Sequence, residues 1–219
     1  LHLGHQTLAD PRHATSMVVT SSSTTRADGR PTAARVTAGA VLGSGAYLLG
    51  YVLTYLLASG PIRESFAQRL VEFVTGEPAT WKMVGWVFYS AHFVETVIPG
   101  LFGSSRTVDL VGALDAVPAL IYLLPPAVLV ASGALLARWA GATGIRDGAT
   151  MGVAVAAGYF PLAVVGAYLF TIAVGDAMAR PDLIPAAFVV GVAYPVVFGG
   201  LGGVAGTVTG RGRPSRPSG

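Results

Sequence analysis

Long apolar runs alternate with short polar segments along most of this chain. A membrane-spanning helix needs about 20 consecutive, largely apolar residues, and five runs come close to that length or exceed it. The runs are Thr37–Ala58, Trp81–Phe102, Val117–Trp139, Ala149–Gly175 and Leu183–Val208. This pattern predicts an all-α fold, a polytopic membrane helix bundle built from five hydrophobic helices.

The second run is ambiguous because it carries polar side chains. Trp81 suits a membrane interface, but His92 and Glu95 lie farther along the same run. A charged residue near the middle of a bilayer costs about 2.5–3.5 kcal/mol on insertion scales. We therefore expect four or five of the hydrophobic helices to span and favour five. A re-entrant helix at Trp81–Phe102 is the alternative.

The segment Ile62–Thr75 is too short and too charged to span. Its apolar residues recur at helical spacing on one face, and its charged residues take the other face. The apolar face holds Ile62, Phe66, Leu70, Phe73 and Val74. Pro61 suits the first helical position and Gly76 suits the stop. The pattern predicts an amphipathic helix in the membrane interface, although a helix packed on another part of the chain would show the same pattern.

Both ends of the chain are polar. Residues 1–35 are rich in Ser, Thr and Arg and lack the apolar stretch of a signal peptide. Residues 209–219 carry three Arg and two Pro. We expect residues 1–35 and 209–219 to be disordered tails around one membrane domain at residues 36–208. Leu1 and Met17 are alternative starts.

Composition supports a lipid environment. Of the 219 residues, 53% are hydrophobic and 11% are charged, whereas soluble domains average about 25% charged residues. The chain has no cysteine, which excludes disulfides and thiolate metal sites. Its basic residues are scattered, which excludes a nucleic-acid-binding stripe. We expect a multi-pass protein of the cell membrane, surrounded by lipid, without a cofactor.

The basic residues also predict sidedness, because Arg and Lys favour the cytoplasmic side. With five spans, eight of the thirteen basic residues that flank the runs share the side of the C-terminal tail. With four spans, eight again share that side, now together with the N-terminal tail. Both arrangements predict a cytoplasmic C-terminal tail and differ in where the N-terminal tail lies.

Each of the last three runs places a tyrosine just before proline. The pairs are Tyr122 with Pro125 and Pro126, Tyr159 with Pro161, and Tyr194 with Pro195. Proline kinks a helix by removing a backbone donor, and broken helices are where transporters build their sites. The pattern predicts a polar cavity among kinked helices. Ordinary packing of Tyr and Pro is the alternative.

His92 and Glu95 are spaced to share one face of a helix. Together they could relay a proton or help to hold a cation, and a polar pair hydrogen-bonded between helices is the alternative. The other histidines lie in the N-terminal tail, so no metal site is predicted. No Ser/His/Asp arrangement or paired carboxylate occurs, so no catalytic residue and no enzyme is predicted.

Glycines recur at four-residue spacing in the first and last runs. The positions are Gly39, Gly43, Gly199, Gly202, Gly203 and Gly206. Small residues at this spacing let helix backbones approach closely. The spacing predicts helix packing, either within one chain or between copies.

Three segments resemble a known family. Residues 76–93, Gly158–Leu162 and Tyr194–Gly199 are similar to a family of uncharacterised membrane proteins from haloarchaea, and the likeness extends over about residues 36–208. Members of that family are sometimes labelled transporters. The resemblance implies an archaeal cell membrane and brings no substrate or site residue with it.

Two functions are open from the sequence. The first is a small transporter or permease-like protein, acting as a homodimer, with its site at His92, Glu95 and the three tyrosines. The second is a non-catalytic assembly subunit that contacts a membrane partner through the glycine-rich last helix.

Overall fold

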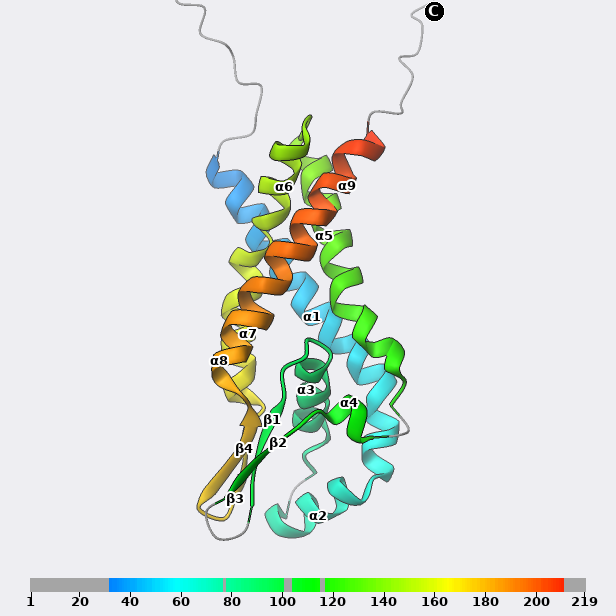
Figure 1. Ribbon diagram of the computed structural model, residues 1–219, viewed down its shortest axis with the longest axis vertical. Helices are drawn as coiled ribbons and strands as arrows, with labels where there is room; N and C mark the ends of the chain where they lie inside the picture. Colours follow the sequence, from blue (N-terminus) through cyan, green and yellow to red (C-terminus); the bar gives the residue numbers. More distant parts are fainter. Residues whose placement is uncertain (1–31, 77, 101–103, 115–116, 211–219) are drawn as a thin grey trace, which may run out of the picture.

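The computed structural model describes residues 32–76, 78–100, 104–114 and 117–210. Within them, four helical stretches are long and apolar enough to cross a membrane. These are Thr32–Glu64, Ala119–Ala140, Ile145–Leu169 and Leu183–Thr209. Figure 1 shows them running along the long axis of the molecule, which confirms the predicted helical membrane bundle. The predicted tails lie almost entirely outside the described residues.

The two ends of the bundle differ. One end carries α2 and a small sheet, and we call it the cap end (Figure 1). The opposite end carries the start of α1, the α5–α6 connection and the end of α9, and we call it the tail end. An even number of spans places the first and last described residues together at the tail end.

The first helix, α1 (Thr32–Glu64), begins inside the predicted N-terminal tail and includes Pro61 near its end. The amphipathic segment therefore starts later than its sequence pattern predicts. Helix α2 (Phe66–Thr75) is capped by Ser65, whose hydroxyl accepts from the Gln68 N–H at 3.1 Å. Gly76 ends α2 with a φ of 74°, a left-handed conformation that favours glycine.

The second apolar run does not cross the bundle, so the favoured five-span arrangement is wrong and the re-entrant alternative fits. Helix α3 (Thr80–Ser90) rises from the cap end toward the middle of the bundle (Figure 1). The chain turns at Phe93, whose φ is 60°, and returns as strand β1 (Thr96–Pro99). The run is apolar because nearly all of α3 is buried in protein.

The returning strand belongs to a four-stranded antiparallel sheet in the order β2-β1-β4-β3. The other strands are β2 (Ser105–Val108), β3 (Ile172–Val174) and β4 (Ala177–Pro181). Thr96 stands opposite both Val108 and Pro181, so β1 joins two hairpins that are far apart in sequence. The all-α prediction did not include this cap sheet, and the residues expected as a short polar loop after the fourth run form β4.

The second span begins irregularly. Helix α4 (Leu110–Ala113) is a single turn, and the 3-10 helix η2 (Ala119–Leu123) leads into α5 (Leu124–Ala140). Pro125 and Pro126 lie in the first turn of α5, where a missing N–H costs little. They lie where η2 passes into α5, and the kink predicted at these two prolines stays a prediction.

The third span is broken and the fourth is widened. Helices α6 (Ile145–Val153) and α7 (Ala156–Leu169) are separated by two residues, and Pro161 lies within α7. The fourth span starts as α8 (Leu183–Pro185) and continues through the π-helical segments η3 (Ala186–Ala193) and η4 (Pro195–Gly199). It ends as α9 (Gly200–Gly210). Pro195 opens η4, so the predicted irregularity takes the form of wide turns here.

Glycines let the long helices touch through their backbones. A Cβ on Gly203 would lie 2.0 Å from the carbonyl oxygen of Gly148, and one on Gly43 would lie 1.9 Å from that of Val155. Gly199 and Gly206 make similar approaches to α6 and α5. The predicted glycine contacts are thus made within one chain, and they hold α9 against α5 and α6 and α1 against the α6–α7 break.

Candidate functional site

His92 lies directly beyond the C-terminal end of α3, deep in the bundle. It is fully buried, and the backbone N–H of His92 donates to the Tyr89 carbonyl at 2.9 Å as the helix unwinds. Because the chain reverses at Phe93, this short helix delivers the imidazole to the interior without crossing it.

Both imidazole nitrogens of His92 have hydrogen-bond partners. Nδ1 lies 2.8 Å from the carbonyl oxygen of Phe88, and Nε2 lies 2.8 Å from the hydroxyl of Tyr159. A carbonyl only accepts, so Nδ1 carries the proton and donates. In the neutral ring Nε2 must then accept, and Tyr159 donates. The geometry holds one defined tautomer of neutral His92.

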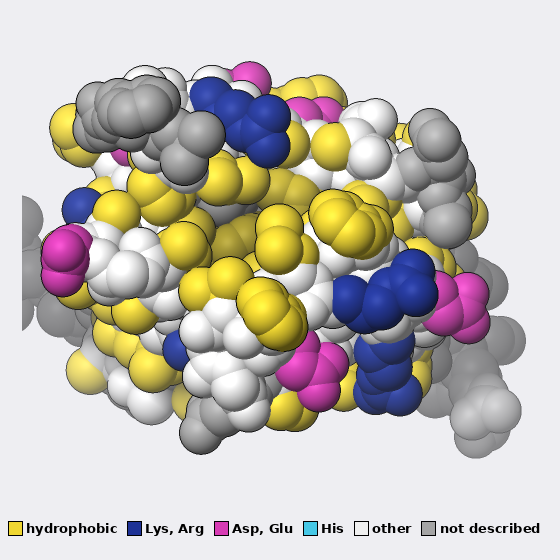
Figure 2. Space-filling view, turned by 90° about the horizontal axis from the view of Figure 1, so that it is seen from below, with side chains coloured by type: hydrophobic (Ala, Val, Ile, Leu, Met, Phe, Trp, Pro, Cys, Tyr) yellow, Lys and Arg dark blue, Asp and Glu magenta, His cyan; other side chains and the backbone are white. Residues whose placement is uncertain are grey.

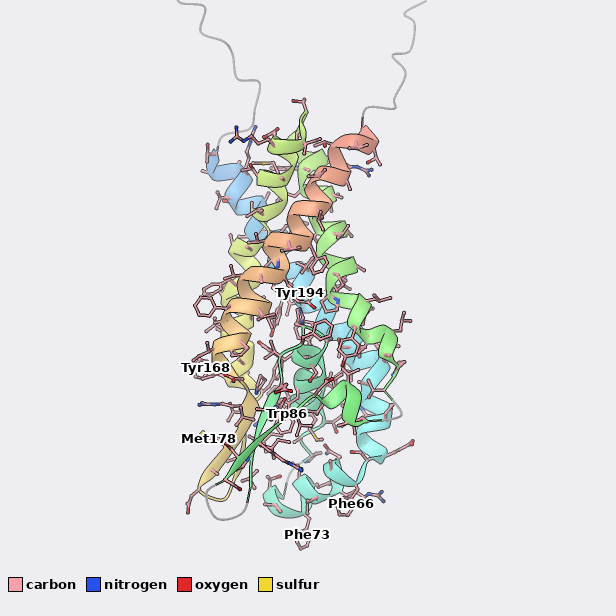
Figure 3. All side chains as sticks on the ribbon, in the orientation of Figure 1. Phe66, Phe73, Trp86, Tyr168, Met178 and Tyr194 are labelled. Carbon is pink, nitrogen blue, oxygen red and sulfur yellow. The ribbon has the colours of Figure 1, made fainter. Side chains whose placement is uncertain are left out.

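Aromatic rings surround this pair. The His92 ring centroid lies 4.8 Å from that of Phe88 and 4.7 Å from that of Tyr194. Tyr47 on α1 packs edge-on against Tyr159 at 5.3 Å. Figure 3 shows Tyr194 at mid-height in the bundle, above Trp86 on α3. The pair therefore sits where α1, α3, α7 and the fourth span meet.

A second polar contact lies beside the first. The hydroxyls of Tyr47 and Tyr89 are 3.1 Å apart, and Tyr89 donates to the carbonyl of Ala163. Gly166 leaves space for both hydroxyls, since a Cβ there would lie 2.0 Å from the Tyr47 hydroxyl. Sequence reasoning missed Tyr47 and Tyr89, because neither precedes a proline and only the fold brings them together.

The irregular parts of two spans lie at this site. Tyr159 is in the first turns of α7, just after the α6–α7 break. Tyr194 stands between η3 and η4, and its N–H bonds five residues back to Val189. Of the predicted site residues, the structure brings His92, Tyr159 and Tyr194 together.

Glu95 and Tyr122 lie elsewhere. Glu95 is exposed and does not share a helical face with His92, because α3 has ended before either residue. Tyr122 donates to a carboxylate oxygen of Asp109 and stacks on Phe93 with ring centroids 5.0 Å apart. Glu95 and Asp109 line a separate hollow of about 120 Å³ beside the turn. The expected pairing of His92 with Glu95 is wrong.

Burial decides the charge state of the histidine. Removing the imidazole from water lowers the pKa of His92 to about 4, and the bond to the Phe88 carbonyl offsets part of that shift. His92 is therefore neutral at neutral pH, in agreement with the tautomer that its partners require.

The chemistry that this pair can support is proton exchange between an imidazole and a phenol. Among the described residues, no three His, Asp or Glu side chains gather as ligands. An imidazole that is hydrogen-bonded to a phenol can accept a proton and then donate a hydrogen bond to the phenol oxygen.

Comparison with known proteins gives a family and no activity. A family model described as a family of unknown function, DUF7978, matches residues 18–210. No curated protein and no solved structure matches the chain significantly.

Proposed function

We propose that this chain, which belongs to the family of unknown function, is a small proton- or cation-coupled transporter whose proton-binding residue is His92. Because the family has no assigned activity, the proposal rests on the residues of this chain. The observation that carries the proposal is the burial of His92 against Tyr159 among broken helices. Of the buried polar side chains in the described part, His92 is the one that titrates near neutral pH in water. Ionisable residues inside membrane proteins mark functional sites by default.

The surrounding backbone supports movement at this point. The α6–α7 break and the π-helical turns of η3 and η4 place irregular backbone on either side of the pair. Discontinuous helices of this kind bind ions and substrates in known transporter folds, and π-helical turns often mark functional sites. The closed geometry described above is then the resting, proton-free state.

Protonation would reverse one hydrogen bond. With both nitrogens of His92 acting as donors, Tyr159 would have to accept and direct its own proton elsewhere. The added charge would also need water or an anion in a site that is closed to bulk solvent in the resting state. We therefore propose that proton uptake separates α7 from α3 and opens the site toward the cap end.

The test is proton flux into vesicles that contain the purified protein, measured with a trapped pH dye under an imposed inside-negative potential. Wild-type protein should carry protons faster than protein-free vesicles, and His92→Gln should abolish the excess. Glu95→Gln and Tyr168→Phe, an exposed tyrosine on α7, are matched controls that should keep it. Equal fluxes from wild type and His92→Gln would overturn the proposal.

The resemblance to haloarchaeal proteins and the charge count support two further parts of the proposal. We place the protein in an archaeal cell membrane with its tail end facing the cytoplasm. In the four-span arrangement, Arg35, Arg138 and Arg146 belong to that end, together with the basic residues of both tails. The predicted homodimer stays a prediction.

A second candidate function, an assembly subunit, is favoured by α2 and not by the last helix. The glycines of α9 already pack on α5 and α6. In contrast, the apolar face of α2 is exposed, with Phe66 at 75% and Phe73 at 87%, and Figure 3 shows both side chains directed away from the bundle. A helix in the membrane interface turns its apolar face toward the bilayer core. The outward direction of these side chains therefore does not favour the predicted interfacial helix.

The assembly function can be tested without disturbing the bundle. The native chain has no cysteine, so Phe73→Cys carries a unique cross-linking site on α2. In native membranes it should give one discrete heavier product, which Phe66→Ser should weaken. A Val41→Cys control on the lipid-facing side of α1 should not give that product. Absence of a discrete product from Phe73→Cys would argue against a partner at α2.

A further inference from the structure

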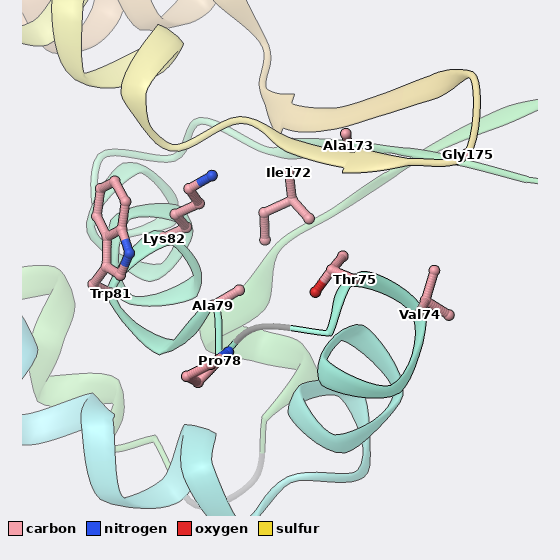
Figure 4. A pocket seen from close by; sticks show the side chains of 9 residues that line it. All are labelled: Val74, Thr75, Pro78, Ala79, Trp81, Lys82, Ile172, Ala173 and Gly175. Carbon is pink, nitrogen blue, oxygen red and sulfur yellow. The ribbon is translucent and has the colours of Figure 1, made fainter.

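A hollow of about 450 Å³ opens at the cap end, apart from the His92 site. It lies between the end of α2, the start of α3 and the β3–β4 hairpin (Figure 4). Figure 2, a view onto this end, shows hydrophobic side chains around a hollowed centre and Lys and Arg nearer the edges. The volume falls in the range of small-ligand sites.

Lys82 supplies the charge of this hollow. Among the described residues that line the hollow, it is the one charged side chain. Its ammonium donates to the Thr171 carbonyl at 2.9 Å and lies 5.5 Å from the centroid of the Trp81 ring. An ammonium has three N–H donors, so two remain for a ligand after the bond to Thr171.

The hollow lies near the cap-end limit of the apolar surface of the spans. The exposed apolar residues of α1 run from Val36 to Leu57, about 30 Å at 1.5 Å per residue, which equals the thickness of a bilayer core. Tyr51, near the cap-end limit of that surface, donates to the backbone carbonyl of Trp81 at 2.9 Å. Trp81 is half-exposed, as interfacial tryptophans are.

We propose that this hollow binds a phosphate-bearing anion, supplied by the headgroup of an anionic membrane lipid. The ammonium of Lys82 would bind the phosphate oxygens, and the Trp81 ring would lie against the part of the lipid between the phosphate and the hydrocarbon chains. The first turn of α3, which has no side-chain cap at Ala79, adds backbone N–H groups to the same wall. A lipid bound there would link α2, α3 and the β3–β4 hairpin.

The proposal is tested by native mass spectrometry of the detergent-solubilised full chain with phosphatidylglycerol, phosphatidylcholine or inorganic phosphate. Wild type should retain phosphatidylglycerol above phosphatidylcholine. Lys82→Met should weaken retention roughly tenfold, the loss expected for one charge-assisted hydrogen bond. Lys82→Arg should restore it, and Arg106→Gln, on an exposed cap-end strand, should leave it unchanged.

A second variant separates the hollow from general charge attraction. Thr75→Phe leaves Lys82 in place and extends a ring into the hollow from the end of α2, where Figure 4 shows Thr75 directed inward, so it should also reduce retention. Retention equal to wild type in either Lys82→Met or Thr75→Phe would overturn the site. Stabilisation by millimolar inorganic phosphate that depends on Lys82, with none by phosphatidylglycerol, would overturn the lipid as the source.

Discussion

Nε2 of His92 lies 2.8 Å from the hydroxyl of Tyr159, a residue 67 positions farther along the chain. The contact ties a re-entrant helix to the third span in a region closed to water. A buried acceptor that loses its donor costs about 1–3 kcal/mol, so we expect this bond to contribute to stability whatever the function of the protein.

Tyr159→Phe should therefore lower the free energy of unfolding by about 1–3 kcal/mol, because Nε2 is left without a donor in a buried site. The measurement is thermal unfolding in detergent. Tyr168→Phe, at an exposed tyrosine of the same helix, should be nearly neutral. An equal loss from both variants would show that the His92 contact contributes nothing specific.

Stability should fall as the pH is lowered from about 6.5 to about 4. The folded state keeps His92 neutral because burial lowers its pKa to about 4, whereas the unfolded chain takes up the proton near pH 6.5. Over that window the unfolded state binds more protons, so acid favours it, by roughly 3 kcal/mol in total.

The pH effect is measured as the unfolding temperature at pH 7 and pH 5. His92→Gln should flatten the difference between the two values. The same pH slope in wild type and His92→Gln would assign it to other groups.

Gly203→Ala should be strongly destabilising, because its Cβ would lie 2.0 Å from the Gly148 carbonyl oxygen and force α9 away from α6. Overpacking of this kind costs about 1–3 kcal/mol or more. Gly45→Ala on α1 is the control, since nothing lies within 4 Å of its Cβ. That change should be neutral or slightly stabilising, because alanine favours helix more than glycine does.

Asp109→Ala should destabilise the segment that covers the re-entrant turn. The Asp109 carboxylate accepts the N–H of Val111 at 3.0 Å and the hydroxyl of Tyr122, so its loss removes a helix cap and a bond to Tyr122 worth about 1–3 kcal/mol together. Hydrogen exchange at residues 110–113 should speed up. Glu95→Ala, at an exposed carboxylate, should leave the exchange unchanged.

Cysteine accessibility should distinguish a re-entrant helix from a crossing one. Glu72→Cys on α2 and Arg106→Cys on β2 flank the second apolar run and should react with an impermeant maleimide from the same side. Arg146→Cys at the tail end should react from the other side. Labelling of Glu72→Cys and Arg106→Cys from opposite sides would mean that this run crosses the membrane.

The sequence allowed the spans to be found, but it left the re-entrant segment only as the alternative to a fifth span. Runs such as Leu183–Val208 are apolar over a length that only a bilayer or a large core requires. The run from Trp81 is long and largely apolar for a different reason, because hydropathy does not distinguish lipid from protein interior. Its turn falls at Phe93, with a φ of 60°, and no Gly or Pro at that position marks it.

The sequence predicted only part of the site, because local patterns identify single residues but not the contacts between distant segments. Proline spacing identified Tyr159 and Tyr194, and polarity within an apolar run identified His92. The pairing of His92 with Glu95 assumed that α3 continues, but α3 ends at Ser90. Tyr47 and Tyr89 carry no local signal, since their hydroxyls meet only after α1 and α3 have packed.

The partners of α3 have a consequence for biogenesis. Trp86 donates to the carbonyl of Phe170 at 2.6 Å, and Tyr89 donates to that of Ala163. The ribosome makes these acceptors 84 and 74 residues after their donors. During synthesis the helix has neither a complete span nor a finished groove to occupy. It must wait beside the insertion machinery until the third span arrives, so a chain truncated before Ile145 should expose it to quality-control proteases.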